Sequence, residues 1–247
     1  MEHSEMNKIP KVIHYCWFGK NKKSEFIEKC IESWGKHLTD YEFIEWNEEN
    51  FDINCNQFVK EAYEEKKWAF VSDYVRLWAL YNYGGIYLDT DVEVLKGFDV
   101  FLEHDSFSGF EDDITIPTGI IGAMKNSQAI NMFLKYYDNR SFYLENGDLD
   151  TTTNVEIITE ICSDQGFEPN GNYQVLNNGM HIYPKEYFCP KEYKTGILRV
   201  TKNTYCIHHF NGSWITKDKR FKKNIRLFMF RVLGERTTNF LLNIVKR

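Results

Sequence analysis

The strongest constraint on the fold is an apolar helix, two glycines and a short apolar strand that ends in two aspartates. Hydrophobic residues recur at three- and four-residue steps across 68–83, which predicts a helix. The pair Gly84–Gly85 ends it, because glycine accepts the left-handed conformation at a helix C-terminus. Residues 86–88 then predict a buried strand that runs into Asp89 and Asp91. Helix followed directly by strand indicates a layered fold of helices and sheet.

The remaining predicted elements continue this alternation. Strands are expected at residues 11–17, 41–46, 106–110, 119–124, 174–176, 181–183 and 206–209, and helices at 24–37, 56–66, 128–137 and 154–166. This order predicts an α/β fold in which helices flank a mostly parallel central sheet. No repeat or Pro/Gly/Ser-rich linker divides the chain. We therefore expect one catalytic domain over residues 1–216 and a basic helical appendage over 217–247.

Composition excludes several classes of protein. The chain has 247 residues, of which 43% are hydrophobic, and this is enough to bury a sizeable core. Its six cysteines form no C-x-x-C pair, so neither a zinc ribbon nor a dithiol redox site is indicated. The N-terminus has no apolar signal segment, and no run of 18 apolar residues exists. We expect a cytoplasmic protein, peripheral on the inner face of the plasma membrane.

The basis for that membrane expectation is an uneven distribution of charge. Residues 217–247 hold ten basic and two acidic residues, whereas the whole chain has a net charge of −6. An acidic body with a basic tail argues against nucleic-acid binding and favours a localised anionic partner. The tail also carries a helical apolar stripe: Phe221, Ile225, Phe228, Met229 and Val232. This stripe either docks on the acidic body or lies in an anionic membrane surface.

Asp89 and Asp91 are the most informative polar residues. Side chains two apart on an extended segment share one face, so both carboxylates can address one divalent cation. Two carboxylates leave positions for phosphate oxygens, as expected when Mg²⁺ or Mn²⁺ binds a diphosphate. The alternative is an ordinary acidic turn after a strand.

Three blocks of sequence resemble the DXD-containing sugar transferases of glycosyltransferase family 32. These relatives include initiation mannosyltransferases, capsular-polysaccharide transferases and the clostridial glucosylating toxins. The blocks are residues 9–19, residues 72–91 and residues 208–214, with 110–200 only loosely matched. The resemblance implies a GT-A type nucleotide-sugar-binding fold and a metal-dependent transfer with retention.

The resemblance also assigns roles to individual residues. It implies that Trp17 stacks on the nucleotide base, although a tryptophan after a strand is otherwise a common core residue. Asp73 and Arg76 share one helix face and are expected to bind the donor sugar or phosphate, the alternative being a simple ion pair. Together with Asp89 and Asp91 they are the predicted catalytic residues. Of the two, Asp91 is expected to be the main metal ligand, and Asp89 is expected to contact mainly the ribose or a water molecule.

A third metal ligand is expected from the pair His208 and His209. Neighbouring strand residues point to opposite faces, so only one imidazole reaches the cation. The spacing from His209 to Gly212 resembles the metal-histidine segment of related transferases, which favours His209. Ser213 and Trp214 resemble the family's closing loop, which contacts the diphosphate together with Gly212.

The predicted function is therefore the metal-dependent transfer of a sugar from a UDP- or GDP-sugar. The acceptor is a saccharide, expected to be lipid-linked, in bacterial capsular or surface polysaccharide synthesis. Alternatives are a haloacid-dehalogenase-like phosphatase, which also uses a D-x-D pair, and a non-catalytic sugar-nucleotide-binding module. P-loop and Rossmann glycine motifs are absent. His14 is expected to be a core histidine, and the acidic residues 111–113, Asp148 and Asp150 are expected to lie in solvated loops.

Overall fold

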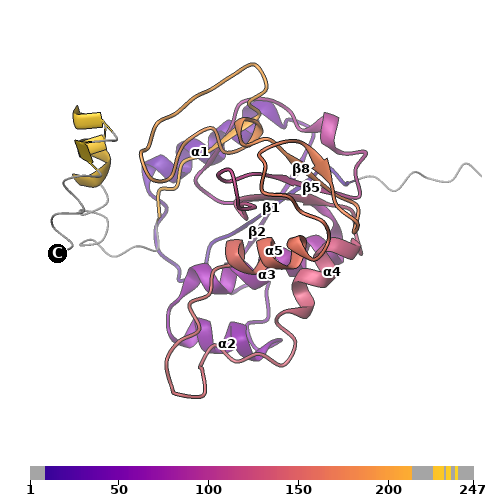
Figure 1. Ribbon diagram of the computed structural model, residues 1–247. Coiled ribbons are helices and arrows are strands. Elements are labelled where there is room, and N and C mark those ends of the chain that lie inside the picture. Colours follow the sequence, from indigo (N-terminus) through magenta and orange to yellow (C-terminus); the bar gives the residue numbers. More distant parts are fainter. Residues whose placement is uncertain (1–8, 213–224, 231, 235–236, 239–247) are drawn as a thin grey trace, which may run out of the picture.

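A seven-stranded sheet forms the centre of the molecule in the computed structural model, which describes residues 9–212, 225–230, 232–234 and 237–238 (Figure 1). Its strands lie in the order β2-β1-β3-β6-β5-β8-β7. Their bounds are β1 Val12–Cys16, β2 Glu42–Trp46, β3 Gly85–Leu88, β5 Ser106–Gly109, β6 Ile120–Ala123, β7 Gln174–Val175 and β8 Met180–Tyr183. A separate two-stranded antiparallel sheet pairs β4 (Val92–Val94) with β9 (Cys206–His208).

Five of the seven central strands run in the same direction. The pairs β1–β2, β1–β3 and β5–β8 are parallel, whereas β6 is antiparallel to both β3 and β5. The edge strand β7 is antiparallel to β8. The prediction of an α/β fold with a mostly parallel central sheet is confirmed.

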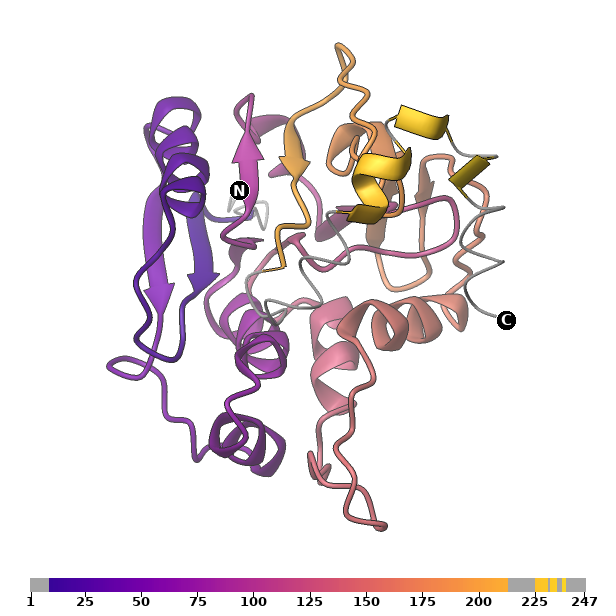
Figure 2. The same ribbon diagram turned by 90° about the vertical axis from the view of Figure 1, so that its left-hand side faces the viewer.

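Helices cover both faces of the central sheet. In Figure 1, α1 (Glu25–His37) lies above it, and α3 (Trp68–Tyr83), α4 (Gln128–Lys135) and α5 (Asn154–Ser163) lie below. The turned view in Figure 2 shows the same order, with α2 (Gln57–Glu64) outside α3. The structure also contains two short 3₁₀ helices, Asp99–Phe101 and Lys185–Tyr187. The sequence pattern predicted neither of these helices, nor did it predict β4. Among the described residues no helix has the length and hydrophobicity to cross a bilayer.

The α3–β3 connection positions the acidic pair. Gly84 has a φ of +71° and Gly85 a φ of +116°, which are backbone conformations that favour glycine. A side-chain carbon at Gly84 would also lie 2.7 Å from the backbone nitrogen of Lys125. The carbonyl oxygen of Gly84 lies 2.8 Å from His14 Nε2. The helix therefore ends abruptly, and β3 delivers Asp89 to the carboxyl edge of the sheet.

Two clusters of buried side chains fill the spaces on either side of the sheet. One lies between the sheet and α2–α5, and the other lies between the sheet and α1. His14 belongs to the core, as predicted: it is fully buried, and Trp46 Nε1 donates to its Nδ1 at 3.2 Å. Burial lowers the pKa of His14, so the ring is neutral and its Nε2–H donates to Gly84.

Candidate active site

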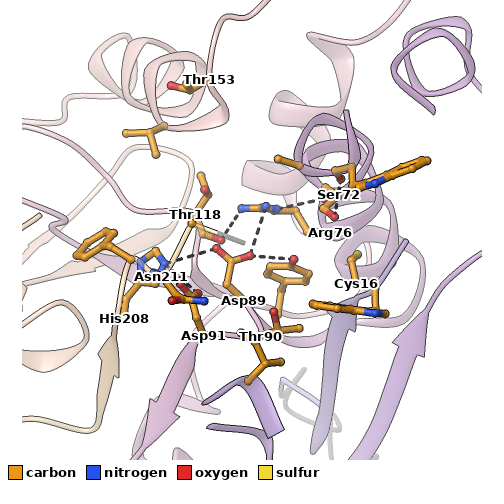
Figure 3. Close-up of a pocket in the computed structure, with 18 of the residues that line it drawn as sticks. Cys16, Ser72, Arg76, Asp89, Thr90, Asp91, Thr118, Thr153, His208 and Asn211 are labelled. Carbon is orange, nitrogen blue, oxygen red and sulfur yellow. Dashed lines mark hydrogen bonds and ion pairs between the residues drawn. The ribbon is translucent and has the colours of Figure 1, made fainter. Parts of the chain in front are cut away.

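A cavity of about 730 Å³ opens along the edge at which β1, β3 and β5 end (Figure 3). Segments far apart in the sequence line it. Trp17 follows β1, Arg76 lies on α3, Asp89 follows β3, and Thr153 caps α5. Such an edge is where open α/β sheets bind ligands, because the loops after parallel strands gather there.

Two carboxylates and one imidazole meet at the centre of this cavity. One ligand atom from each of Asp89, Asp91 and His208 lies within 4.8 Å of the others. His208 Nε2 is 3.3 Å from Asp91 Oδ1 and 3.7 Å from Asp89 Oδ2 (Figure 3). The second oxygen of Asp91 accepts a 2.6 Å hydrogen bond from the backbone nitrogen of Asn211. The sequence did not single out Asn211, and no signal in its pattern marks it.

The structure corrects the choice between the two histidines. His209 Nε2 lies 2.8 Å from Glu93 Oε2, away from the two aspartates. The register of β4 and β9 explains this, because Glu93 lies opposite Ile207, and His209 shares the face of Ile207. His208 projects from the other face, toward the cavity. The prediction that His209 joins Asp89 and Asp91 is therefore wrong, and the neighbouring residue takes that position.

Gly119 makes room for the His208 ring. A side-chain carbon at Gly119 would lie 2.8 Å from two atoms of the imidazole. The buried Nδ1 of His208 has no hydrogen-bond partner among the described residues, and Nε2 is directed at the carboxylates. One nitrogen atom and two carboxylates form the mixed ligand set that suits Mn²⁺ or Mg²⁺.

The electrostatics of this cluster are strongly coupled. Burial disfavours charge on Asp91, but His208 and the hydrogen bond from Asn211 lower the pKa of Asp91 to about 2. Burial also disfavours the imidazolium, but the two aspartates raise the pKa of His208 to about 9. The cluster therefore stabilises positive charge, which a divalent cation supplies in place of the proton.

Arg76 holds the cavity floor together. Its guanidinium donates to the carbonyl oxygens of Ser72 at 3.2 Å and Thr118 at 2.8 Å. It also lies 3.0 Å from Asp73 Oδ1, 3.4 Å from Asp89 Oδ1 and over the ring of Tyr87. Through these contacts the planar guanidinium group of Arg76 links α3, the end of β3 and the segment that leads into β6.

Asp73 lies behind Arg76 and is not among the residues that line the cavity. Burial raises the pKa of Asp73 to about 6, although the charge of Arg76 opposes this. Asn154, at the start of α5, donates to its backbone carbonyl oxygen at 3.0 Å. In this arrangement Asp73 orients Arg76, and its predicted contact with the donor sugar stays a prediction.

Trp17 and Gly212 mark two other parts of the cavity lining. The Trp17 indole donates to the carbonyl oxygen of Asn21 at 2.6 Å, and Lys23 Nζ lies 5.2 Å from its ring centre. Gly212 has a φ of +63°. Ser213 and Trp214 lie outside the described residues, so their predicted contact with the diphosphate stays a prediction.

The acidic loops only partly match expectation. Asp112 and Asp113 are exposed, as predicted, but Glu111 is half-buried and lines the cavity. Asp148 is exposed, whereas Asp150 is buried beside Arg140 at 3.4 Å. Hydrophobic periodicity cannot locate such residues, because their burial depends on elements far away in the sequence.

The two histidines provide a matched pair of variants for metal binding. His208→Gln is expected to weaken Mn²⁺ binding by at least about tenfold, because it removes a ligand. His209→Gln removes the contacts of this ring with Glu93 and Phe26, which lie away from the two aspartates, and should bind Mn²⁺ as the wild type does. Titration calorimetry measures both affinities. Equal affinities for the two variants would contradict the assignment of His208.

The pH dependence of Mn²⁺ binding follows from the same geometry. Because His208 has a pKa of about 9 without the cation, its proton must leave before the ring can bind one. The affinity for Mn²⁺ in wild-type protein should therefore rise with pH, by up to about tenfold per unit, between about pH 7 and 9. An affinity that stays flat over this range would contradict this coupling.

One region of the chain matches a known family model. Residues 24–108 match the family model described as "Glycosyltransferase sugar-binding region containing DXD motif". This region contains α3, β3, Arg76, Asp89 and Asp91 but neither Trp17 nor His208. The resemblance to DXD glycosyltransferases of the family 32 type is confirmed, and the architecture is GT-A-like.

Particular relatives agree with this class. Inositol phosphoceramide mannosyltransferases 3 and 1 of Schizosaccharomyces pombe (strain 972 / ATCC 24843) are 29% and 30% identical over 128 and 113 residues, which are 47% and 42% of this chain. The match spans about a third of the length of each relative, 34% in both cases. A solved structure, "PaToxG Glycosyltransferase", shares the fold with a TM-score of 0.50 and 20% identity over 64% of this chain and 69% of that one. All three of these similar proteins are named as glycosyltransferases or mannosyltransferases.

Proposed function

We propose that this chain transfers a sugar from a nucleotide-sugar donor to a saccharide or lipid-linked acceptor, with the help of a divalent cation. The observation that carries this proposal is the convergence of Asp89, Asp91 and His208 in one cavity beside Arg76. A volume of about 730 Å³ is of the size that holds a nucleotide-sized ligand. Domain boundaries at 1–216 for catalysis and 217–247 for the appendage belong to the same proposal.

Asp89, Asp91 and His208 would hold the cation. When bound, Mn²⁺ or Mg²⁺ neutralises the charge of the diphosphate leaving group. Arg76 is fixed by four polar contacts, so its charge stays directed at this part of the cavity without reorganisation. The side chains thus stabilise the negative charge that develops as the sugar–phosphate bond breaks.

The nucleoside would lie on the Trp17 side of the cavity. Trp17, Phe18 and Trp68 line this part and offer aromatic surface to a base. Lys22 also lines the cavity and adds a positive charge that can attract a phosphorylated ligand. Both UDP- and GDP-sugars fit this description, because stacking on an indole does not distinguish the bases.

The test is the release of nucleoside diphosphate from a panel of UDP- and GDP-sugars with Mn²⁺. At least one donor should release nucleotide, and EDTA should stop the release. The distribution of anomers in the product, measured by NMR, tests the proposed retention. Absence of release and of binding across the panel would reject the proposed function.

The acceptor is the finer part of the proposal. The two yeast relatives are named for transferring mannose to inositol phosphoceramide, which is a lipid. Their names support a hydrophobically anchored acceptor here, and a role in capsular or surface polysaccharide synthesis is consistent with such an acceptor.

The C-terminal segment supports association with a membrane surface. Residues 225–230 are helical, and this helical segment stands at the edge of the molecule (Figure 1). Leu227 lies against the body, since a side-chain carbon at Gly196 would be 3.1 Å from it. Phe228 is nevertheless 66% exposed, and Ile225 and Val232 are also exposed. Partial docking thus leaves these apolar side chains available to a membrane surface.

Sedimentation with lipid vesicles tests this association. The full chain should sediment with anionic vesicles at low salt and not with neutral ones, because each basic residue contributes about 1 kcal/mol near an anionic surface. A chain that ends at Thr216 should stay in the supernatant. Phe228→Ser should weaken the binding, whereas Val100→Ser, at a similarly exposed residue on the body, should not. Equal sedimentation of the full and shortened chains would contradict the proposal.

A further inference from the structure

The order of the strands places different residues at the two ends of the cavity. Neighbouring strands β1, β3, β6 and β5 bring four residues to this edge in sequence across the sheet. Trp17 follows β1, Asp89 follows β3, Thr118 precedes the antiparallel β6, and Glu111 follows β5. A nucleoside at Trp17 and a diphosphate at Asp89 leave the Glu111 end for the sugar and for whatever attacks it.

Glu111 is a carboxylate that lines this end of the cavity, and the positive charge of a protonated His208 attracts it. Among the residues that the structure describes, none donates a hydrogen bond or forms an ion pair with its side chain, although Glu111 is half-buried. The other acids nearby are engaged: Asp112 accepts from Thr115, and Glu156 pairs with Thr153 in a capping box. A half-buried carboxylate without donors is unfavourable until a ligand supplies one.

The loop holds Glu111 firmly in place. Its backbone nitrogen donates to the carbonyl oxygen of Thr115 at 2.9 Å, and that of Phe110 donates to Tyr183 at 2.9 Å. Phe110 is fully buried against Phe167, which anchors the residue before Glu111 in the core. The backbone of Glu111 is therefore fixed at this edge of the cavity, which limits the positions that its carboxylate can take.

The cavity that Glu111 lines also contains groups of the kind that bind sugars. Thr118 and Thr153 bring hydroxyl groups to its lining, and Thr153, whose hydroxyl also pairs with Glu156, lies across the cavity from Asp89 (Figure 3). Tyr193 and Phe210, whose ring centres are 5.4 Å apart, add aromatic surface to the lining. Hydroxyl and carboxylate groups beside aromatic rings suit a polar ligand with apolar C–H faces, which is the chemistry of a saccharide.

We propose that Glu111 binds the acceptor hydroxyl group beside the donor sugar, and that this end of the cavity is the acceptor-saccharide subsite. This inference rests on the proposed function. An ionised carboxylate only accepts hydrogen bonds, and a sugar hydroxyl group is the donor that Glu111 lacks. Burial raises the pKa of Glu111; the charge of His208 opposes this, and Asp112 and Asp89 act in the same direction as burial.

Donor hydrolysis tests this role without knowledge of the acceptor, because water takes the place of the acceptor hydroxyl. Glu111→Ala should slow nucleotide release from the donor in water by at least tenfold. Its dissociation constant for the donor with Mn²⁺, measured by calorimetry, should stay within twofold of the wild type. Glu111→Gln keeps an oxygen atom at the same reach, so it should release nucleotide faster than Glu111→Ala.

Asp113→Ala is the matched control. Asp113 lies in the same loop, is exposed and contacts Lys185 outside the cavity lining, so its variant should release nucleotide at the wild-type rate. A wild-type rate in Glu111→Ala would overturn the inference. So would a loss of donor affinity as large as the loss of rate, since Glu111 would then contact the donor. A wild-type protein that neither binds nor cleaves any donor would overturn the proposed function, and this inference with it.

Discussion

Asp91→Asn is expected to lower metal-dependent nucleotide release by on the order of a thousandfold. Asp91 lies at the centre of the cluster, with Oδ1 3.3 Å from His208 Nε2. The amide of asparagine has no charge, so one of the two negative charges that attract the cation is lost. The low pKa of Asp91, about 2, means that the wild-type carboxylate is charged throughout the neutral range.

This variant should fold normally. The amide oxygen of asparagine can still accept the hydrogen bond from Asn211. The hydrogen bond from the backbone nitrogen of His209 to the carbonyl oxygen of residue 91 does not involve the side chain. Thermal unfolding and Mn²⁺ titration, with Asp113→Asn as the control, separate loss of metal from loss of fold. Full activity in Asp91→Asn, or in wild-type protein with EDTA, would reject the metal site.

Arg76→Lys is expected to lower nucleotide release by at least about tenfold, although the charge is conserved. The Arg76 side chain makes polar contacts with Ser72, Thr118 and two aspartates at once. One ammonium group on a flexible stem cannot reach all of them. The Thr118 carbonyl oxygen and Asp73 would lose donors in a buried setting, which costs about 1–3 kcal/mol of stability for each group left unsatisfied.

Arg199→Lys is the control for this substitution. Arg199 has a side chain that is 72% exposed, and its contact with Glu192 is 3.7 Å long. The same chemical change there should leave both the melting temperature and the rate unchanged. Wild-type kinetics in Arg76→Lys would show that catalysis needs only the positive charge at this position and not the planar guanidinium with its several contacts.

The sequence alone determined those features that short-range physics controls. The helix Trp68–Tyr83 was predicted with the correct ends, because its apolar spacing and the two glycines act within a few residues. Ser24 caps α1 by accepting from the backbone nitrogen of Ile27, as its position before the helix predicts. Asp89 and Asp91 reach one site for the same reason, since two residues of extended chain return side chains to one face.

Only the tertiary structure decided which distant groups join that pair. Both His208 and His209 fit the sequence pattern, and the register of β9 on β4 determines which ring enters the cavity. The sequence pattern predicted that Glu111 lies in a solvated loop. In the structure, β5 lies two strands from β3, and this brings Glu111 to the edge of the cavity. Strand order and register arise from contacts between residues separated by tens to more than a hundred positions. Local periodicity carries no information about such contacts, because it reports only how a segment is buried and not what buries it.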